Sequence, residues 1–586
     1  MFDIDKKSLS GNFWKLNQTD ERKAELISQR YELPFLLSKI IASRGVLVDD
    51  VDNFINPKIQ NLMPNPTVLK DVDKACKKLA DYIVAKKNIA IIGDYDVDGA
   101  TSSSVLKLYL EEVGLNPLIH IPDRDEGYGP SKFAIDKFSA QGFDLVVTVD
   151  CGTTAFDAFN YAKEKNINII VIDHHEAEAK LPDVYALINP KRLDESDSVP
   201  YLKYMAAVGV VFLTVVALNR ELRDRGFFKN NSEPNLMQML DLVALGTVCD
   251  VVPLQGLNRA FVRQGLKIMS QRQNLGLKTL IDISGITEAP RAFHLGYVLG
   301  PRINAGGRVG DSFLGSSLLC SKNELEAKSL AQKLNDFNTE RKDVESYVLL
   351  NAIETLEGSA QEYPIAFVYG NDWHQGVIGI VAGKLKERYN LPSFVMSVES
   401  DEVKGSARSI SGIDLGALIV AAKEKGLITK GGGHTMAAGF SLEADKIEDF
   451  RHFVGEYVKN KIGSEDITPV IEIDAALDPL GVNLELAEKL ELLEPFGAGN
   501  HEPKIMLSRV RVNKPTIVGA GHIRCFLSSS SQSSIKAMAF RIADTELGKS
   551  LLNSNGEHYN IIGVLRKDTW QGRNSVQFII EDAMTA

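Results

Sequence analysis

The chain has 586 residues, of which 44% are hydrophobic and 24% are charged, and its formal net charge is −11. Such a composition is that of an ordinary globular protein, and the length predicts about four domains. The negative charge argues against a surface coated with positive potential for duplex DNA, but it does not exclude a locally basic channel.

Cysteine usage and hydropathy indicate the cellular compartment of the protein. The five cysteines are scattered without a C-x-x-C pair, which argues against a disulfide framework or a cysteine zinc site and for a reducing compartment. The start of the chain lacks the basic and apolar regions of a signal peptide. The longest apolar stretch, Met205–Leu218, is shorter than the ~20 residues of a membrane span and predicts a buried helix. We therefore expect a soluble cytoplasmic protein.

The first half of the chain predicts a helical preface and an α/β domain. Residues 1–70 form the preface, and from Val72 to Asn189 strand and helix patterns alternate, which is typical of βαβ units around a parallel sheet. The expected strands are Asn88–Gly93, Leu118–Ile121, Leu145–Val149, Asn168–Ile172 and Tyr185–Ile188, and the expected helices are Val72–Ala85, Thr101–Val113, Lys132–Gln141 and Phe156–Lys165. Residues 200–320 turn mostly helical, so this domain spans 71–320.

The second half predicts a connector helix and two smaller domains. Glu324–Leu356 is a long charged helical run, which we expect as a connector within residues 321–360. Residues 361–460 predict a smaller α/β domain that starts with a strand at Tyr363–Tyr369. Residues 467–586 predict a small barrel or sandwich because short strand patterns alternate with Gly, Ser and Asn. These strands are Val510–Val518, His522–Leu527, Ile535–Phe540, Tyr559–Leu565 and Ser575–Ile580.

Acidic residues follow four apolar runs that we expect to be buried strands. Asp94, Asp96 and Asp98 follow Asn88–Gly93; Asp150 follows Asp144–Val149; Asp173-His174-His175 follows Ile167–Ile172; and Asp250 follows Leu242–Cys249. Ligands of open α/β sheets bind outside the carboxyl ends of the strands. Carboxylates and imidazoles delivered there from several strands can build a two-metal site. The first hypothesis is therefore a metal-dependent phosphoryl hydrolase.

Two other interpretations of the first acidic loop are open. Its D-x-D-x-D-G pattern matches the start of a calcium EF-hand loop, but the twelfth position, which needs a bidentate Glu, is Val105. Alternatively, Asp98 or Thr101 caps the following helix. Capping explains one carboxylate but hardly three, since three within five residues repel one another unless a cation neutralises them.

The Asp173-His174-His175 triplet adds imidazole to the carboxylates. Two of the chain's ten histidines stand here, and alternation lets one face a metal cluster and the other a substrate. Neutral imidazole binds Mn, Zn or Fe, whereas carboxylates favour Mg²⁺ and Mn²⁺. With no thiolate nearby, the ligand set favours two Mn²⁺ or Mg²⁺ ions.

With these elements in order, the chain resembles the DHH phosphoesterase family, and within it the bacterial single-strand-specific 5′→3′ DNA exonucleases. The matching motifs are Gly93–Gly99, Val149–Gly152, Ile172–His175, Gly246–Leu254, Gly300–Ala305, Trp373–Gly379 and Gly431–His434. The resemblance implies a DHH-type parallel-sheet domain, a long helix, a DHH-associated α/β domain and a C-terminal OB-like barrel.

The resemblance also implies roles for individual residues. The metal ligands would be Asp94, Asp96, Asp98, Asp150, His174 and Asp250. The catalytic residues would be Asp98, His175 facing the scissile phosphate, and Asp173 supporting the histidines. Candidate substrate-binding residues are Arg124, Arg302, Trp373, His374, Ser406, Arg408, Gly432, Gly433 and His434.

These substrate contacts compete with ordinary structural roles. Each arginine could form a surface salt bridge instead of holding a terminal phosphate. The glycine run could be a turn instead of a phosphate-binding nest, and Trp373 could be a core residue instead of a base-stacking one. In the barrel, an expected basic face comprises Arg509, Arg511, Lys514, Arg524, Arg566, Lys567, Trp570 and Arg573.

The implied activity is metal-dependent hydrolysis of single-stranded DNA from the 5′ end to 5′-mononucleotides, in DNA repair and recombination. The alternative is a DHH phosphodiesterase acting on short oligoribonucleotides or cyclic dinucleotides, which needs neither the barrel nor the long helix. Gly548-Lys549-Ser550 ends like a Walker A motif, but position 543 is Ala, so we expect no ATP site. The family implies a helicase and a single-strand-binding protein as partners.

Overall fold

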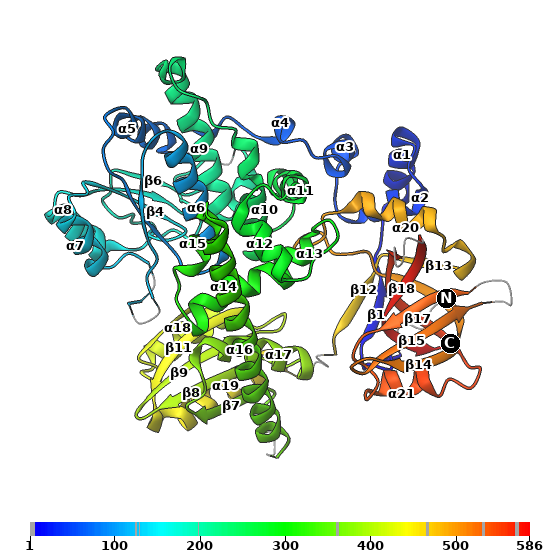
Figure 1. Cartoon of the computed structure of the whole chain (residues 1–586). Coiled ribbons are helices and arrows are strands. Elements are labelled where there is room, and N and C mark those ends of the chain that lie inside the picture. Colours follow the sequence, from blue (N-terminus) through cyan, green and yellow to red (C-terminus); the bar gives the residue numbers. More distant parts are fainter. Residues whose placement is uncertain are drawn as a thin grey trace. The chain divides into compact units, whose positions relative to one another are not determined.

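The computed structural model describes residues 6–123, 126–127, 129–196, 198–358, 362–463, 468–529, 534–568 and 574–586. The chain forms two compact units (Figure 1). The first comprises Met1–Gly307, Asp311–Asn335 and Ile471–Ala586, and the second comprises Arg308–Gly310 and Asp336–Val470. Within the described part of the chain, no helix is both long and apolar enough to cross a membrane.

A five-stranded parallel sheet forms the centre of the first unit. Its order is β3-β2-β4-β5-β6. The strands are β2 (Ala90–Gly93), β3 (Leu118–His120), β4 (Leu145–Val149), β5 (Asn168–Ile172) and β6 (Ala186–Ile188). Their apolar residues are almost fully buried, as expected for a sheet covered on both faces. The predicted parallel α/β fold is confirmed.

Helices cover both faces of this sheet (Figure 1). One face packs against α7 (Lys132–Ala140) and α8 (Phe156–Glu164) through the core around Phe138 and Phe159. The other face packs against α5 (Val72–Val84), α6 (Val97–Glu112) and α9 (Ala207–Asp224). The stretch predicted as a buried helix is most of α9.

The run before Asp250 is a helix, so the strand prediction for Leu242–Cys249 is wrong. It forms α10 (Leu240–Cys249), which packs against α6, α9 and α11 (Gly256–Ser270). A short run that is apolar on every side cannot be assigned to strand or helix by periodicity. Here partner helices bury all faces, and Gly265 of α11 lets the two helices approach closely, since a Cβ there would lie 2.1 Å from the Leu240 carbonyl oxygen.

Further helices lead from α11 to the second unit. They are α12 (Leu275–Ile283), α13 (Ala292–His294), a π-helical turn at Leu295–Leu299, α14 (Gly300–Val309), α15 (Leu314–Cys320) and α16 (Glu324–Glu357). The predicted connector is α16, which passes from one unit into the other between Asn335 and Asp336. Its buried apolar side chains are Ala327, Ala331 and Leu334 in the first unit and Val348, Ala352 and Leu356 in the second.

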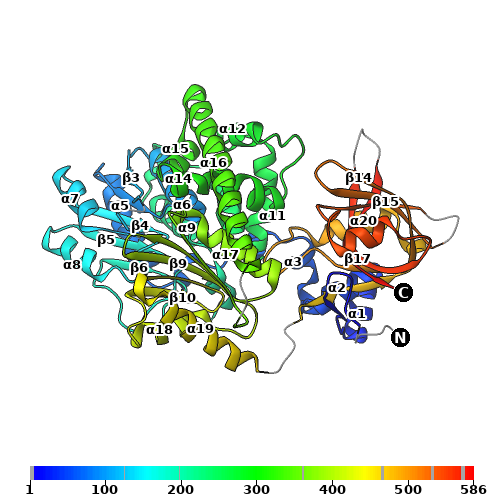
Figure 2. The same cartoon turned by 90° about the horizontal axis from the view of Figure 1, so that it is seen from below.

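The second unit is built on a mixed sheet of order β10-β11-β9-β8-β7. The strands are β7 (Ala366–Asn371), β8 (Ser393–Glu399), β9 (Glu402–Arg408), β10 (Lys430–His434) and β11 (Ala437–Glu443). One face packs against α18 (Leu415–Glu424) and α19 (Ile447–Ile462) around Phe394, Phe440 and Phe450. The other face packs against α16 and α17 (Gln375–Tyr389) (Figure 2).

The C-terminal part of the first unit is a β-barrel. Its order is β13-β14-β15-β16-β18-β17, and β17 also pairs with β14, which closes the barrel. The strands are β13 (Ala475–Leu477), β14 (Ile505–Val518), β15 (His522–Ser528), β16 (Ile535–Ala539), β17 (His558–Asp568) and β18 (Ser575–Thr585), accompanied by α20 (Leu484–Leu490) and α21 (Glu546–Leu552). The predicted barrel is confirmed.

The N-terminal preface packs against this barrel. It contains the expected helices α1 (Glu21–Tyr31), α2 (Phe35–Ser43), α3 (Val51–Ile55) and α4 (Ile59–Leu62), but also an unexpected strand, β1 (Phe13–Leu16), which pairs with β12 (Val470–Ile473). Residues of α1 and α2 share one core with the barrel strands. The fully buried carboxylate of Asp582 accepts hydrogen bonds from the side chains of Ser8, Asn12 and Trp14.

Candidate metal centre

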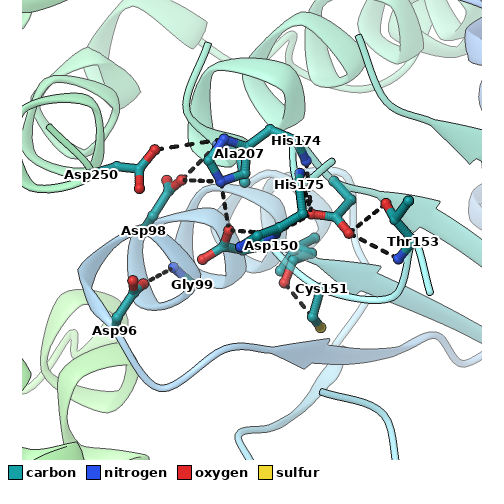
Figure 3. A network of polar contacts seen from close by, with 12 residues as sticks. Asp96, Asp98, Gly99, Asp150, Cys151, Thr153, His174, His175, Ala207 and Asp250 are labelled. Carbon is teal, nitrogen blue, oxygen red and sulfur yellow. Dashed lines mark hydrogen bonds and ion pairs between the residues drawn. The ribbon is translucent and has the colours of Figure 1, made fainter. Parts of the chain in front are cut away.

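The predicted metal ligands gather in the first unit, at the carboxyl end of the parallel sheet. Figure 3 labels all of them except Asp94. They follow β2, β4 and β5 and the end of α10. Three sets of ligand atoms lie close enough to hold an ion, each within 4.8 Å of one another. The sets are Asp94/Asp96/Asp150, Asp98/His174/Asp250 and Asp150/His174/His175. The third set shares Asp150 with the first and His174 with the second.

The first acidic loop joins β2 to α6, which rules out two helices flanking an EF-hand. Asp96 caps α6, because its carboxylate accepts a 3.0 Å hydrogen bond from the Gly99 backbone N–H. The alternative interpretation, in which Asp98 or Thr101 caps this helix, is therefore excluded. Asp98 instead accepts hydrogen bonds from the N–H groups of Ala207 (2.6 Å) and Val208 (2.9 Å) at the start of α9. The Asp98 carboxylate thus holds the N-terminus of α9 beside the cluster.

Asp150 stands in a left-handed backbone conformation immediately after β4, with φ 61°. Its N–H donates to the Ile172 carbonyl oxygen at 3.0 Å, which ties it to the end of β5. Such conformations are costly for residues other than glycine, although Asp and Asn tolerate them best, and they persist at functional sites. The backbone therefore aims this carboxylate into the cluster.

His174 presents Nε2 to two carboxylates, whereas its Nδ1 lies beside the backbone and 3.6 Å from Asp250 Oδ2. Its Nδ1 lies 3.0 Å from the Met205 carbonyl oxygen, an acceptor only, so Nδ1 carries the proton. Its Nε2 then has a lone pair, 3.2 Å from Asp150 Oδ1 and 3.8 Å from Asp98 Oδ2 (Figure 3). Burial lowers the pKa of His174 to about 4. A neutral imidazole aimed at carboxylates suits metal binding.

Asp173 belongs to none of the three ligand sets and holds both neighbouring residues. Its carboxylate accepts bonds from the N–H and hydroxyl of Thr153 at 2.9 and 2.6 Å and from the backbone N–H of His174 and His175. It also accepts a 2.8 Å bond from His175 Nδ1. Burial opposes ionisation, but the bonds from His175 and Thr153 hold the pKa of Asp173 below its usual range.

His175 is exposed over 43% of its side chain, whereas His174 is almost buried. Burial acts to lower the pKa of His175, but the hydrogen bond to Asp173 and the nearby carboxylates raise it overall. The Nδ1 of His175 is engaged by Asp173 and lies 4.0 Å from Asp150 Oδ1. The two adjacent histidines therefore have different environments, as their alternation predicts.

The charges of the cluster need a cation. Burial, followed by the charge of Asp96, raises the pKa of Asp98 to about 7, and burial with the charge of Asp98 raises that of Asp250 to about 9. The pKa of Asp150 is also far above normal, first through burial and then through neighbouring carboxylates. The buried Oδ2 of Asp250 accepts no hydrogen bond from the described residues. Oxygen-rich ligands with one or two imidazoles fit Mn²⁺ or Mg²⁺.

Sequence reasoning missed several residues that orient the ligands. Asn189 donates hydrogen bonds of 2.8 Å to the Thr153 hydroxyl and to the His175 carbonyl oxygen. It follows β6, so the carboxyl-end rule that selected Asp94 and Asp150 could also have selected it. Gly246 brings α10 close to Asp98, since a Cβ there would lie 3.0 Å from Asp98 Oδ1. Gly246 opens the matching motif Gly246–Leu254, but its place there gave no reason to assign it a role.

The predicted substrate-binding residues divide between the units. Arg302, in the first, donates to the Val298 carbonyl oxygen (2.7 Å) and to Asn335 Oδ1 (3.1 Å), so it braces the π-helical turn against α16. Arg124 lies outside the described residues. The remaining ones belong to the second unit.

Within the second unit, Ser406 and Arg408 lie on β9, opposite Gly379 of α17. Arg408 donates to the Ser406 hydroxyl (3.1 Å) and to the Ala407 carbonyl oxygen, and no carboxylate among the described residues pairs with it. Burial lowers its pKa. His374 caps α17, since its Nδ1 accepts a bond from the Gly376 N–H.

Two candidates have environments that favour structural roles. Trp373 is 6% exposed and packs in the core with Val348, Val377 and Val381, so little ring surface is available for stacking. Gly432, Gly433 and His434 belong to strand β10, which pairs with β11 at the edge of the sheet. The glycine run is thus an extended edge strand rather than the predicted nest.

Three family models match the chain. The DHH family N-terminal domain matches residues 88–247, the DHHA1 domain matches 362–460 and the RecJ OB domain matches 473–582. Together they cover the parallel-sheet domain, most of the second unit and the barrel.

Curated relatives and solved structures agree with these models. The single-stranded-DNA-specific exonuclease RecJ of Escherichia coli is 34% identical over 94% of this chain and 96% of that relative. Its counterpart in Bacillus subtilis is 32% identical over 97% of this chain and 70% of that relative. The crystal structure of RecJ with Mn²⁺ from Thermus thermophilus is 25% identical, with a TM-score of 0.81, and covers 98% of this chain and 79% of that chain. The chain belongs to the RecJ family of DHH-domain proteins.

Proposed function

We propose that this protein is a metal-dependent exonuclease that hydrolyses single-stranded DNA from its 5′ end and releases 5′-mononucleotides, in DNA repair and recombination. The observation that carries the proposal is the buried cluster of Asp94, Asp98, Asp150, His174 and Asp250 in a chain of the RecJ family. Its RecJ relatives are named single-stranded-DNA-specific exonucleases, and one was crystallised with Mn²⁺ and also with Mg²⁺.

Six side chains would hold two Mn²⁺ or Mg²⁺ ions: Asp94, Asp96, Asp98, Asp150, His174 and Asp250. Bound ions would lower the pKa of an attacking water and neutralise the charge that develops on the phosphate. The residues supply rigid orientation, because the α9 N-terminus holds Asp98, the backbone conformation directs Asp150 and Met205 fixes the His174 tautomer. No protein nucleophile is required.

His175 would contact the scissile phosphate. Its Nδ1 proton is engaged by Asp173, and its raised pKa favours the imidazolium, which can donate a hydrogen bond from Nε2 to a phosphate oxygen. Asp173 would act through His175 and His174 rather than on substrate. This pair resembles the carboxylate–histidine arrangements that orient ligands around metal sites.

The terminal 5′-phosphate would bind in the second unit, on Ser406, Arg408 and His374 at the start of α17. Arg408 has no competing carboxylate among the described residues, and its fork suits a phosphate. The helix N-terminus adds favourable N–H groups. Gly379 leaves the space, since a Cβ there would lie 3.0 Å from Ser406 Oγ and 3.1 Å from Arg408 Nη2.

The barrel would hold the strand away from the reaction site. Arg511, Arg524 and Phe526 are exposed on neighbouring strands β14 and β15, and cations with aromatics suit single-strand binding. Arg566 and Lys567 pair with Glu502 and Glu488, so the basic face is smaller than predicted. Trp570 and Arg573 lie outside the described residues.

The chain carries no nucleoside-triphosphate motif that would let it open a duplex. We therefore propose that a helicase supplies its single strands and that a single-strand-binding protein is a further partner. Work on chromosomal DNA would place the protein in the cytoplasm.

The metal assignment is tested with internally labelled single-stranded DNA and Mn²⁺. Asp150→Asn is the sharpest variant, because Asn removes the charge yet tolerates the left-handed backbone. It and His174→Ala should lower turnover at least a thousandfold at saturating Mn²⁺, with unchanged circular dichroism. Turnover within tenfold of wild type in either variant would remove that residue from the ligand set.

A further inference from the structure

Residues 495–500 form a loop that precedes barrel strand β14, and this loop contacts the segment that follows Asp250. The Leu254 N–H donates a 2.8 Å hydrogen bond to the Ala498 carbonyl oxygen. A Cβ on Gly499 would lie 3.1 Å from Pro253 Cβ, and one on Gly497 would lie 2.8 Å from Leu254 Cδ1. Both glycines therefore permit a close approach between this loop and the metal-binding part of the unit.

Two buried side chains, Arg259 and Asn500 of the loop itself, bind the backbone where the loop begins, at residues 493–495. Arg259, which is 1% exposed, donates to the carbonyl oxygens of Leu493 (2.8 Å), Glu494 (2.9 Å) and Pro495 (3.2 Å). Asn500, which is 2% exposed, donates to the carbonyl oxygens of Leu493 (2.9 Å) and Pro495 (2.7 Å). Because these donors are buried, releasing the loop would leave them unpaired.

On the metal side, the turn after Asp250 needs support. Val251 has φ 59° and is 71% exposed, although a β-branched residue disfavours this conformation. Such strain persists only where the surroundings enforce it. Leu254, buried and bonded to the loop, anchors the chain three residues later.

The same segment reaches His174. Asn258, which is 2% exposed, donates to the carbonyl oxygens of Pro253 (3.1 Å) and Tyr204 (2.8 Å). The next residue, Met205, supplies the carbonyl that fixes the His174 ring. Pro253 is therefore connected to Asp250 along the chain, and to His174 through Asn258 and the backbone of Tyr204 and Met205.

We propose that loop 495–500 is a positioning element of the metal centre, which holds the turn after Asp250 and thereby orients Asp250 and His174. The inference rests on the proposed metal-dependent function. It follows that an alteration of this loop weakens metal binding although the loop supplies no ligand. Loop 495–500 thus joins the barrel, which would bind the DNA strand, to the metal centre. A measurement of the affinity for metal can detect a change in this contact.

The test is the variant Gly499→Ala in the full chain. Gly499 has φ 68°, so Ala adds backbone strain and a methyl group against Pro253. The matched control is Gly556→Ala in the same barrel, where φ is 81° and nothing lies within 4 Å of the new Cβ. Mn²⁺ binding is measured by calorimetry and by electron paramagnetic resonance of free Mn²⁺.

We expect the Kd for Mn²⁺ to rise about tenfold or more in Gly499→Ala, as for lost supports of metal ligands, and to stay unchanged in Gly556→Ala. Most hydrolysis should return at saturating Mn²⁺. If the wild type binds Mn²⁺ and cleaves DNA but the Kd of Gly499→Ala is unchanged, the positioning role is overturned and the proposed function is not. A wild type that neither binds Mn²⁺ nor cleaves DNA would overturn the proposed function with it.

If Gly499→Ala does not fold, Pro253→Gly tests the same contact from the other side. It removes the Pro253 Cβ, which lies nearest to a Cβ built on Gly499, together with the rest of the ring, and introduces no positive-φ strain. A rise of about threefold or more in the Kd for Mn²⁺ would support the positioning role, and a wild-type Kd would overturn it.

Discussion

Asp173 accepts a 2.8 Å hydrogen bond from Nδ1 of His175, its neighbour but one along the chain. The same carboxylate binds the backbone of both histidines and the side chain of Thr153. Asp173 therefore fixes the ring of the exposed histidine without joining any of the three ligand sets.

Asp173→Asn should lower kcat at least tenfold while the Kd for Mn²⁺ changes less than threefold. The amide keeps the shape but loses the charge that orients and stabilises the His175 imidazolium. The control is Asp136→Asn, an exposed carboxylate that accepts a bond from Tyr161 away from the site. Equal kcat values for both variants would show that Asp173 does not act through His175.

Gly379→Ala should reduce the preference for 5′-phosphorylated over 5′-hydroxyl DNA ends. The new methyl group would press on Ser406 Oγ and Arg408 Nη2, which the proposal assigns to the terminal phosphate. KM for the phosphorylated strand should rise about tenfold, whereas KM for the hydroxyl strand should hardly change. Gly383→Ala in the same helix meets nothing within 4 Å and is the control. Parallel changes in both KM values would place the phosphate site elsewhere.

Asp241→Asn should stabilise the protein at neutral pH. Asp241 is 2% exposed at the start of α10, and burial raises its pKa to about 7, compared with about 3.9 in the unfolded chain. The wild type therefore loses stability relative to the variant as pH rises from about 4 to 7, on the order of 2–4 kcal/mol in total. Denaturant melts across this range measure the difference, which should vanish near pH 4. A constant difference would mean that Asp241 does not titrate there.

The parallel sheet and its acidic edge could be predicted because they rest on local patterns. Apolar runs of strand length ended in Asp94, Asp150 and Asp173, and the strands lie where these runs predict them. The same rule failed for Leu242–Cys249, because α6, α9 and α11 bury every side of α10 and remove the periodicity on which the prediction depends.

Contacts between distant parts of the chain could not be predicted. Asp98 caps a helix that starts more than a hundred residues later, and strand β1 pairs with β12 across most of the chain. The start of α9 and strand β12 carry no motif that marks them as partners, since backbone N–H groups of any residue can make these bonds. A motif can also suggest a contact that packing does not favour. The motif around Trp373 suggested substrate contact, whereas its side chain packs in the core.

The most direct test of the account is the polarity of Mn²⁺-dependent hydrolysis, measured on internally labelled single-stranded DNA blocked at one end or the other. The account predicts that a 5′ block alone stops release of 5′-mononucleotides, that a 3′ block has no effect and that Asp150→Asn is inactive on both substrates. Degradation that continues past a 5′ block, or activity confined to di- and trinucleotides, would contradict it.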